Sequence, residues 1–267
     1  MTVTEHTPVQ VTDSFVEHPQ GRLFVRTWEG AAGAAPILLL HDSLGCVELW
    51  RDFPAALAQA MGRRVIAYDR LGFGRSDPRF GALEPAFIEE EARTVLPLLQ
   101  RALGFRRFVA FGHSVGGGMA VHCAALHPDD CVALVTESAQ AFVEERTRAG
   151  IRDARAGFQD PAQFARLARY HGDKARWVLD AWTETWLSPA FAAWSLDGVL
   201  PRVRCPLLAL HGEHDEFGSL RHPETIARGA TGAARVEIIA GAFHVPHREQ
   251  GGLVLRHVGD FLSAPRA

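Results

Sequence analysis

The stretch RRFVAFGHSVGGGMAVHCAALH, residues 106–127, decides the fold of this chain. Its apolar, β-prone run Phe108–Phe111 leads directly to Ser114, and three consecutive glycines and a helix-like segment follow. A chain that turns sharply from a strand into a helix needs nearly bare positions on both sides of the turn, and Gly112 and Gly116 provide them. The stretch therefore predicts a strand, a tight turn and a helix, with the hydroxyl of Ser114 at the turn. Amide N–H groups at the start of such a helix favour negative charge nearby.

Strand-like and helix-like segments alternate along the chain on both sides of this turn. An N-terminal β-hairpin is predicted around residues 18–21, because alternating segments flank these four residues. Buried strands are predicted at Ile37–Leu40, Arg64–Tyr68, Phe108–Phe111, Val132–Thr136, Pro206–Leu210 and Arg235–Ile239. Helices are predicted at Asp52–Met61, Glu89–Ala102, Met119–Leu126, His222–Arg228 and Gly251–Leu262. Strands separated by helices favour parallel pairing, so we predict an α/β fold whose mostly parallel central sheet carries helices on both faces.

Residues 140–203 interrupt this alternation. The segment is helical in pattern and contains no run typical of a buried strand. It lies between two predicted strands of the sheet, so we predict a helical cap inserted over the strand ends. The α/β core then consists of residues 1–139 and 204–267.

The predicted cap is rich in tryptophan, since it contains Trp177, Trp182, Trp186 and Trp194. Ligand pockets are typically lined by aromatic side chains, and the junction between a cap and a sheet is a place where they form. We therefore expect Trp182 and Trp186 to contact the substrate, together with Leu44 from a loop of the core. The alternative for the tryptophans is packing between cap and core.

Composition and charge exclude several classes of partner. The formal net charge is −3, the isoelectric point is about 6.5 and no basic run is present, so we expect no nucleic acid partner. No stretch approaches the roughly 20 apolar residues that span a bilayer. The polar N-terminal segment also lacks the apolar core of a signal peptide. These features predict a cytoplasmic protein with no membrane partner, and they leave its oligomeric state open.

A serine hydroxyl becomes a strong nucleophile only when a base takes its proton and an acid holds that base. Asp215 follows the predicted strand 206–210 in a loop at its carboxyl end, where the active sites of parallel sheets lie. His244 lies in the short loop between the last strand and the last helix. The chain order Ser114, Asp215, His244 is the order that accompanies this type of turn. Alternative acids remain open at three positions, Glu137, Glu213 and Glu216.

With these residues the chain resembles the α/β-hydrolase superfamily, and specifically its capped, single-domain branch of esterases, lactonases and related hydrolases. Three further stretches are similar to that branch: YDRLGFGRSD at 68–77, GEHD at 212–215 and HVPHRE at 244–249. The resemblance spans nearly the whole chain. It implies nucleophilic catalysis by Ser114 with His244 as base and Asp215 as the acid.

The loop His41–Cys46, with the sequence HDSLGC, resembles the oxyanion loop of this superfamily, which usually begins His-Gly. The resemblance implies that the backbone N–H groups of Ser43 and Val115 bind the oxyanion of the reaction. Asp42 replaces the usual glycine, and we expect its carboxylate to point away, because a negative charge would oppose an oxyanion. His41 is expected to brace the loop through hydrogen bonds.

The remaining histidines and cysteines give no sign of a metal site or a cofactor. His113 is expected to point away from Ser114 and to have a structural role. His211, His214 and His247 lie close to the predicted acid and base, but their spacing matches no familiar set of metal ligands. The cysteines, one of which is Cys46 in the oxyanion loop, are widely spaced and are expected to be buried thiols. We therefore expect neither a metal nor a cofactor.

The expected activity is hydrolysis of a small carboxylic ester or lactone through an acyl-enzyme. The resemblance also argues against haloalkane dehalogenases and epoxide hydrolases. These members of the superfamily have an aspartate at the position of Ser114. Two alternatives remain: hydrolysis of a C–C bond by the same three residues, and a ligand-sensing protein that turns over slowly or not at all.

Overall fold

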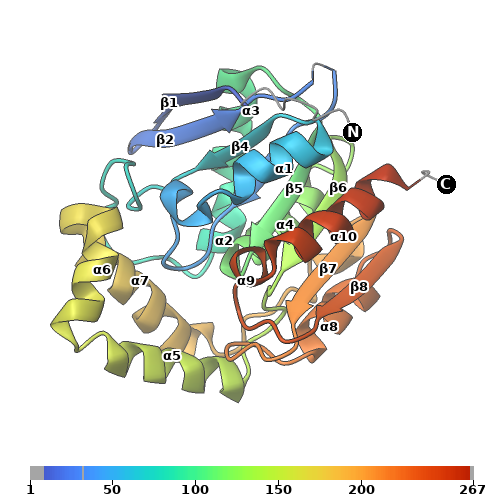
Figure 1. The fold of residues 1–267 in the computed structure, drawn as a ribbon. Helices are drawn as coiled ribbons and strands as arrows, with labels where there is room; N and C mark the ends of the chain where they lie inside the picture. Colours follow the sequence, from blue (N-terminus) through green and yellow to red (C-terminus); the bar gives the residue numbers. More distant parts are fainter. Residues whose placement is uncertain (1–8, 32, 265–267) are drawn as a thin grey trace, which may run out of the picture.

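The computed structural model describes residues 9–31 and 33–264, so the first eight residues of the polar N-terminal segment lie outside this range. The described residues form one eight-stranded sheet in the order β1-β2-β4-β3-β5-β6-β7-β8 (Figure 1). The first two pairings, β1 with β2 and β2 with β4, are antiparallel, and all the others are parallel. The strands are β1 (Val11–His18), β2 (Gly21–Trp28), β3 (Ile37–Leu40), β4 (Val65–Tyr68), β5 (Phe108–His113), β6 (Cys131–Glu137), β7 (Leu207–Gly212) and β8 (Ala234–Ile239). The predicted hairpin and mostly parallel sheet are confirmed.

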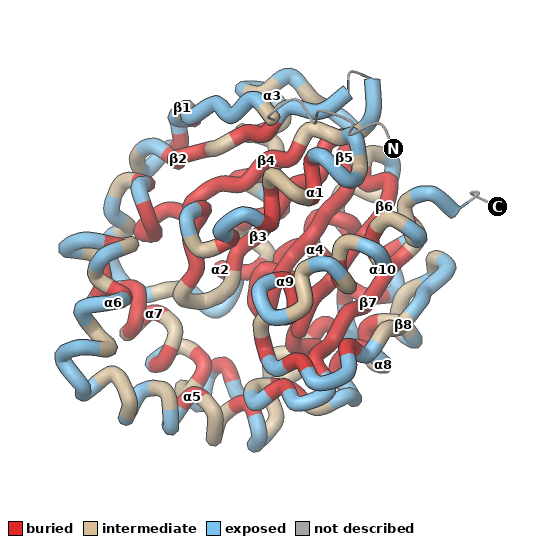
Figure 2. The backbone as a smooth tube through the Cα atoms, viewed as in Figure 1, coloured by how far each residue is buried: buried red, intermediate tan, exposed pale blue. Residues whose placement is uncertain are grey.

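The central strands are continuous apolar runs because both faces of the sheet are covered. Every residue of β3, β4, β5, β6 and β7 is buried, as parallel sheets between two layers of helices require. In the edge strand β8, three of the six residues are exposed and one is buried. Figure 2 shows this contrast as a buried centre within an exposed rim.

Helices cover the two faces of the sheet. On one face lie α1 (Phe53–Met61), α9 (Pro246–Glu249) and α10 (Gly251–Ser263), and on the other lie α2 (Phe87–Glu90), α3 (Leu96–Leu103), α4 (Val115–Leu126) and α8 (Arg221–Gly229) (Figure 1). Each face buries its own apolar cluster, represented by Leu57 and Val258 on the first and by Leu99 and Met119 on the second.

The helix expected at Glu89–Ala102 is not uniform. It runs through α2, a π-helical turn at Glu91–Val95 and α3. Pro97 has no backbone N–H to donate to the preceding turn, and we attribute the wider turn at this point to that missing hydrogen bond. The segment remains helical throughout and packs against α4.

The helical insertion follows β6, where the alternation of strands and helices stops. It contains α5 (Glu145–Gly157), α6 (Pro161–His171) and α7 (Ala175–Leu187), which stand together beside the sheet in Figure 1. The short 3-10 turn Leu200–Arg202 at the end of the insertion packs back against α4 and α8 of the core. Residues of α5 and α7 line one cavity together with Ser114 and His244, so this part of the insertion lies over the loops at the carboxyl ends of β5 and β8. Within the described residues, no helix has the length and apolar character needed to cross a membrane.

Candidate active site

The turn at Ser114 is as sharp as the sequence predicts. Ser114 has a positive φ of 56° with ψ of −125°, a backbone conformation that side chains rarely adopt. A Cβ atom on Gly112 would lie 1.9 Å from the carbonyl oxygen of Gly116, and one on Gly116 would lie 2.1 Å from that of Leu40. Both glycines are therefore required by the close approach of the backbone. Strand β5 ends at His113 and α4 begins at Val115, so Ser114 alone makes the turn.

Ser114, His244 and Asp215 form one continuous chain of hydrogen bonds. The Oγ atom of Ser114 lies 3.0 Å from Nε2 of His244, and Nδ1 of His244 lies 2.9 Å from each carboxylate oxygen of Asp215. Asp215 also accepts hydrogen bonds from the backbone N–H groups of Phe217 and Gly218, which fix its carboxylate. The three residues come from the loops after β5, β7 and β8, and the structure brings together all three that the sequence singled out.

The electrostatics of this chain favour a histidine that takes up a proton. Burial by itself would lower the pKa of His244, but the neighbouring carboxylates, Asp215 foremost through its charge and its hydrogen bond, together raise the pKa above its ordinary value. The carboxylates of Glu216 and Asp42 add to the same upward shift. Burial would raise the pKa of Asp215, yet His244 and the hydrogen bonds lower it to about 2. Asp215 therefore stays ionised while His244 changes its charge.

None of the alternative acids is hydrogen-bonded to the ring of His244 in the described part of the chain. The carboxylate of Glu137 is buried and hydrogen-bonded to Nδ1 of His247. Glu213 is exposed and accepts a hydrogen bond from the backbone N–H of Gly241. Glu216 is exposed on the lip of the cavity described below. Asp215 is the carboxylate that holds His244 among the described residues.

The loop 41–46 lies against the turn at Ser114, and His41 braces it. Nδ1 of His41 donates to the carbonyl oxygen of Asp42 over 2.8 Å, and Nε2 accepts from the backbone N–H of Arg70 over 3.1 Å. Burial holds the pKa of His41 well below its ordinary value, so the ring is neutral, as this donor and acceptor pair requires. Neither the N–H of Ser43 nor that of Val115 donates a hydrogen bond to another described residue.

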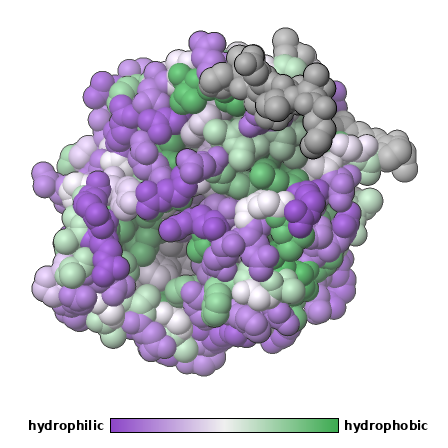
Figure 3. Space-filling model, in the orientation of Figure 1, coloured by the Kyte–Doolittle hydropathy of each residue, from purple (hydrophilic) through white to green (hydrophobic). Residues whose placement is uncertain are grey.

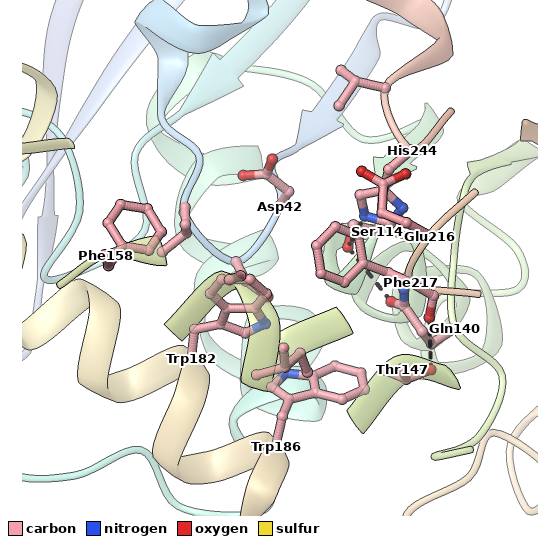
Figure 4. Close-up of a pocket in the computed structure, with 15 residues that line it drawn as sticks. Asp42, Ser114, Gln140, Thr147, Phe158, Trp182, Trp186, Glu216, Phe217 and His244 are labelled. Atoms are coloured by element: carbon pink, nitrogen blue, oxygen red, sulfur yellow. Dashed lines mark hydrogen bonds between the residues drawn. The ribbon is translucent and has the colours of Figure 1, made fainter. Parts of the chain in front are cut away.

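The carboxylate of Asp42 turns toward the neighbouring backbone and His113 rather than toward Ser114. Its Oδ1 atom is buried without a hydrogen-bond partner among the described residues, and a Cβ atom on Gly45 would lie 2.2 Å from it. Its Oδ2 atom lies 3.6 Å from Nδ1 of His113. Figure 4 shows the carboxylate directed away from Ser114.

A cavity of about 240 Å³ opens above Ser114 between the helical insertion and the core. Figure 3 shows this side of the molecule hollowed, with hydrophobic side chains in the hollow and hydrophilic ones around it. The three residues expected to bind substrate, Leu44, Trp182 and Trp186, all line the cavity (Figure 4). Trp194 instead stacks on Phe191, and the remaining tryptophan of the insertion packs outside the cavity against Phe73.

Several lining residues had no role in the sequence prediction. One face of α5 supplies Thr147, Ile151 and Ala154, and Phe158, the residue that ends the helix, follows; their spacing of four, three and four residues is that of a helix face. That spacing is a signal that could have identified them. Phe217 and Gln140 also line the cavity, from the loop after β7 and the segment after β6. No local pattern marks these two.

A buried cluster of His113, Glu137 and His247 lies behind His244, and the sequence prediction did not anticipate it. One nitrogen or carboxylate oxygen from each of the three side chains lies within 4.8 Å of the others, a spacing that one metal ion could bridge. The closest pair is hydrogen-bonded, Glu137 to His247, and Nε2 of His113 donates to the backbone carbonyl oxygen of His244 over 2.8 Å. The bond from His113 holds the loop of His244, while Oε1 of Glu137 is buried without a hydrogen-bond partner among the described residues.

Cys46 has the surroundings of a structural thiol. It is buried, and burial raises the pKa of its thiol to about 12. It does not line the cavity above Ser114. The other three cysteines, Cys123, Cys131 and Cys205, are also buried free thiols, as expected.

Comparison with known proteins places the chain in a family. A family model described as the alpha/beta hydrolase fold matches residues 35–250. The chain is 28% identical to the serine hydrolase BPHL of Mus musculus, over 86% of this chain and 80% of that protein. It is 23% identical to the proline iminopeptidase of Lactobacillus delbrueckii subsp. lactis, over 95% of this chain and 99% of that protein. The solved structure of serine hydrolase CCSP0084 from Cycloclasticus zankles superposes with a TM-score of 0.80 at 18% identity, covering 95% of this chain and 98% of that one. Its fold, its sequence and the match over most of its length show that this chain belongs to the alpha/beta hydrolase family.

Proposed function

We propose that the protein is a serine hydrolase that cleaves a small carboxylic ester or lactone through an acyl-enzyme. The observation that carries the proposal is the unbroken chain from Ser114 through His244 to Asp215 at the base of an apolar cavity. Similarity to a relative named as a serine hydrolase supports the same reaction class.

In the proposed reaction, Oγ of Ser114 attacks the carbonyl carbon while Nε2 of His244 takes the hydroxyl proton. Asp215 holds the ring through Nδ1 and stabilises the imidazolium that forms. The N–H groups of Ser43 and Val115 bind the oxyanion in this reaction. Neither has a hydrogen-bond partner among the described residues. His244 then gives its proton to the leaving oxygen, and a water molecule activated by the same ring releases the acid.

The lining of the cavity favours a neutral, apolar or aromatic substrate. Most of the side chains around it are apolar, and those of Trp182, Trp186 and Phe217 are aromatic. Its charged lining side chains, Asp42 and Glu216, are both acidic. An anionic substrate would meet two like charges beside His244, so we expect anionic esters to react more slowly than neutral ones of the same shape.

The proposal is tested with a graded series of p-nitrophenyl esters, from acetate to long-chain esters, and with the matching p-nitroanilides. We expect the wild-type protein to hydrolyse the esters faster than the anilides and the Ser114→Ala variant to hydrolyse neither. Ester turnover that survives in Ser114→Ala would contradict the proposal. If serine-directed phosphonates label Ser114 but no ester is turned over, the ester assignment is wrong, and C–C substrates and ligand sensing become the alternatives to pursue.

A further inference from the structure

Gln140 is a buried polar residue beside the nucleophile that the proposed reaction does not use. It lies three residues after the end of β6, lines the cavity and is only 3% exposed. Its Oε1 atom lies 3.5 Å from Oγ of Ser114, which is at the long limit for a hydrogen bond. Figure 4 shows the side chain next to Ser114, on the side that faces Thr147 and Trp186 of the insertion.

The backbone around Gln140 holds its side chain in this position. Ser138 has a positive φ of 50°, which turns the chain after β6, and its N–H donates to the carbonyl oxygen of Leu210 over 2.9 Å. The N–H of Ala141 donates to Nδ1 of His222 over 3.1 Å. Gln140 therefore lies between two anchored residues, and its amide is aimed at the cavity by a fixed backbone.

The amide of Gln140 has unused hydrogen-bonding capacity. A glutamine side chain offers two N–H donors and two acceptor lone pairs, and the long contact with Ser114 is the one hydrogen bond it makes to a described residue. Nearby, the hydroxyl of Thr147 is already committed, because it donates to the carbonyl oxygen of Phe217 over 2.7 Å. An alkyl group packed over Gln140 would remove water from the amide and leave it unpaired, which is unfavourable.

We propose that Gln140 selects substrates whose acyl group carries a hydrogen-bonding oxygen close to the scissile carbonyl, as in hydroxy, alkoxy or oxo acids. The assignment rests on the ester hydrolysis proposed above. A site built to hydrogen-bond a polar group discriminates strongly against the analogue that lacks it. The acyl side follows from the geometry: His244 must face the leaving oxygen to protonate it, and in Figure 4 His244 and Gln140 lie on opposite sides of Ser114.

The test compares matched pairs of p-nitrophenyl esters that differ by one oxygen. Methoxyacetate is paired with butanoate, and 3-methoxypropanoate with pentanoate, so that each pair has the same chain length. The measured quantity is the ratio of kcat/KM for the ether to that for the alkyl ester, in the wild type divided by the same ratio in each variant. Intrinsic differences in ester reactivity cancel in this quotient.

Two variants of Gln140 and one control make the comparison. Gln140→Met keeps the length of the side chain and removes the amide, and Gln140→Glu keeps the shape but replaces the N–H donors with a carboxylate oxygen and its negative charge. Gln163→Met makes the same chemical change on α6, away from the cavity. Phosphonate titration of Ser114 counts the folded sites, so both Gln140 variants are compared per active site.

For at least one of the two pairs we expect the quotient to be about tenfold or more in both Gln140 variants and near one in Gln163→Met. A quotient near one for both pairs in both variants would overturn the inference, as would an equal loss on ether and alkyl esters. A parallel pair with the oxygen in the alcohol, 2-methoxyethyl against butyl phenylacetate, is expected to show no change. An effect on that pair alone would place the polar group on the leaving side and contradict the assignment. Failure of the wild type to hydrolyse any ester would instead refute the proposed function, and the inference with it.

Discussion

Nε2 of His113 donates a 2.8 Å hydrogen bond to the backbone carbonyl oxygen of His244, so the residue before Ser114 holds His244 on the side away from Ser114. Burial lowers the pKa of His113 to about 4, which keeps its ring neutral at physiological pH. A neutral ring with its proton on Nε2 donates this hydrogen bond without adding a positive charge behind His244.

Removal of this support is expected to slow the reaction without removing any reacting group. His113→Ala should lower kcat at least about tenfold, because His244 then loses part of its positioning, while KM changes little. His113→Asn retains an N–H donor and should recover part of the loss. Steady-state kinetics of the two variants, with circular dichroism as a control for folding, provide the measurement. Equal activity of His113→Ala and wild type would show that the hydrogen bond has no positioning role.

Loss of the Asp215 carboxylate should mainly affect catalysis, whereas loss of the Glu137 carboxylate should mainly affect stability. Asp215→Asn is expected to lower kcat about 10⁴-fold, because an amide cannot hold the histidine in the tautomer that accepts the hydroxyl proton. Glu137→Gln breaks a buried pair with His247 and should mainly reduce the free energy of unfolding, by about 3 kcal/mol. Ester kinetics and urea unfolding of both variants separate the two effects. A 10⁴-fold loss of kcat in a stable Glu137→Gln protein would move the role of the acid to Glu137.

The pH dependence of kcat/KM should follow the ionisation of His244. Only the neutral ring accepts the serine proton, so activity rises as the pH increases through the raised pKa of His244. Glu216 contributes to that upward shift, and Glu216→Gln should therefore move the acidic limb to lower pH. Glu213→Gln makes the same charge change on the same loop, outside the cavity, and serves as the control. A shift to higher pH in Glu216→Gln would contradict the assigned electrostatics.

Backbone strain at Ser114 predicts an unusual order of stability. Glycine adopts the positive φ of 56° without steric conflict, whereas alanine retains the conflict of the wild-type residue. Ser114→Gly should therefore be about 1 kcal/mol more stable than Ser114→Ala, although both are inactive. Urea unfolding of the two variants measures the difference. Greater stability of the alanine variant would mean that the turn is not strained.

The helical insertion should limit the length of the acyl chain that the cavity accepts from an ester substrate. Ala154 lies on the face of α5 that lines the cavity, between Ile151 and Phe158. Ala154→Phe fills space at this wall, so the optimum in the p-nitrophenyl ester series should shift to shorter chains, with acetate hydrolysis changed least. Ala156→Phe on the exposed side of the same helix is the matched control. An unchanged chain-length profile in Ala154→Phe would show that the acyl chain does not extend toward α5.

The parts of this site that could be predicted from sequence are those fixed by local chain geometry. The glycines around Ser114 mark a turn with no room for side chains, and the loops of Asp215 and His244 follow apolar runs that form strands. Gln140 and His113 are different, because their roles depend on contacts with residues far away in the chain. Alternation correctly indicated that His113 points away from the cavity, but not that it would reach the backbone of His244, 131 residues later.

The π-helical turn between α2 and α3 shows a similar limit. Apolar spacing predicts a helix across Glu89–Ala102, and a helix is present, but the spacing does not distinguish an α-helical from a π-helical ladder. A proline such as Pro97 can kink a helix, end it or widen one of its turns, and the sequence does not indicate which of these occurs. Packing against α4 retains the helix here.

Titration of Ser114 with a serine-directed fluorophosphonate tests the central claim most directly. Ester turnover and the extent of labelling are measured in the same samples, and peptide mass spectrometry locates the label. The account predicts one label per chain, on Ser114, with turnover falling in proportion to labelling and reaching zero at full occupancy. Turnover that persists in fully labelled protein, or a label on another residue that abolishes it, would contradict the assignment of Ser114 as the nucleophile.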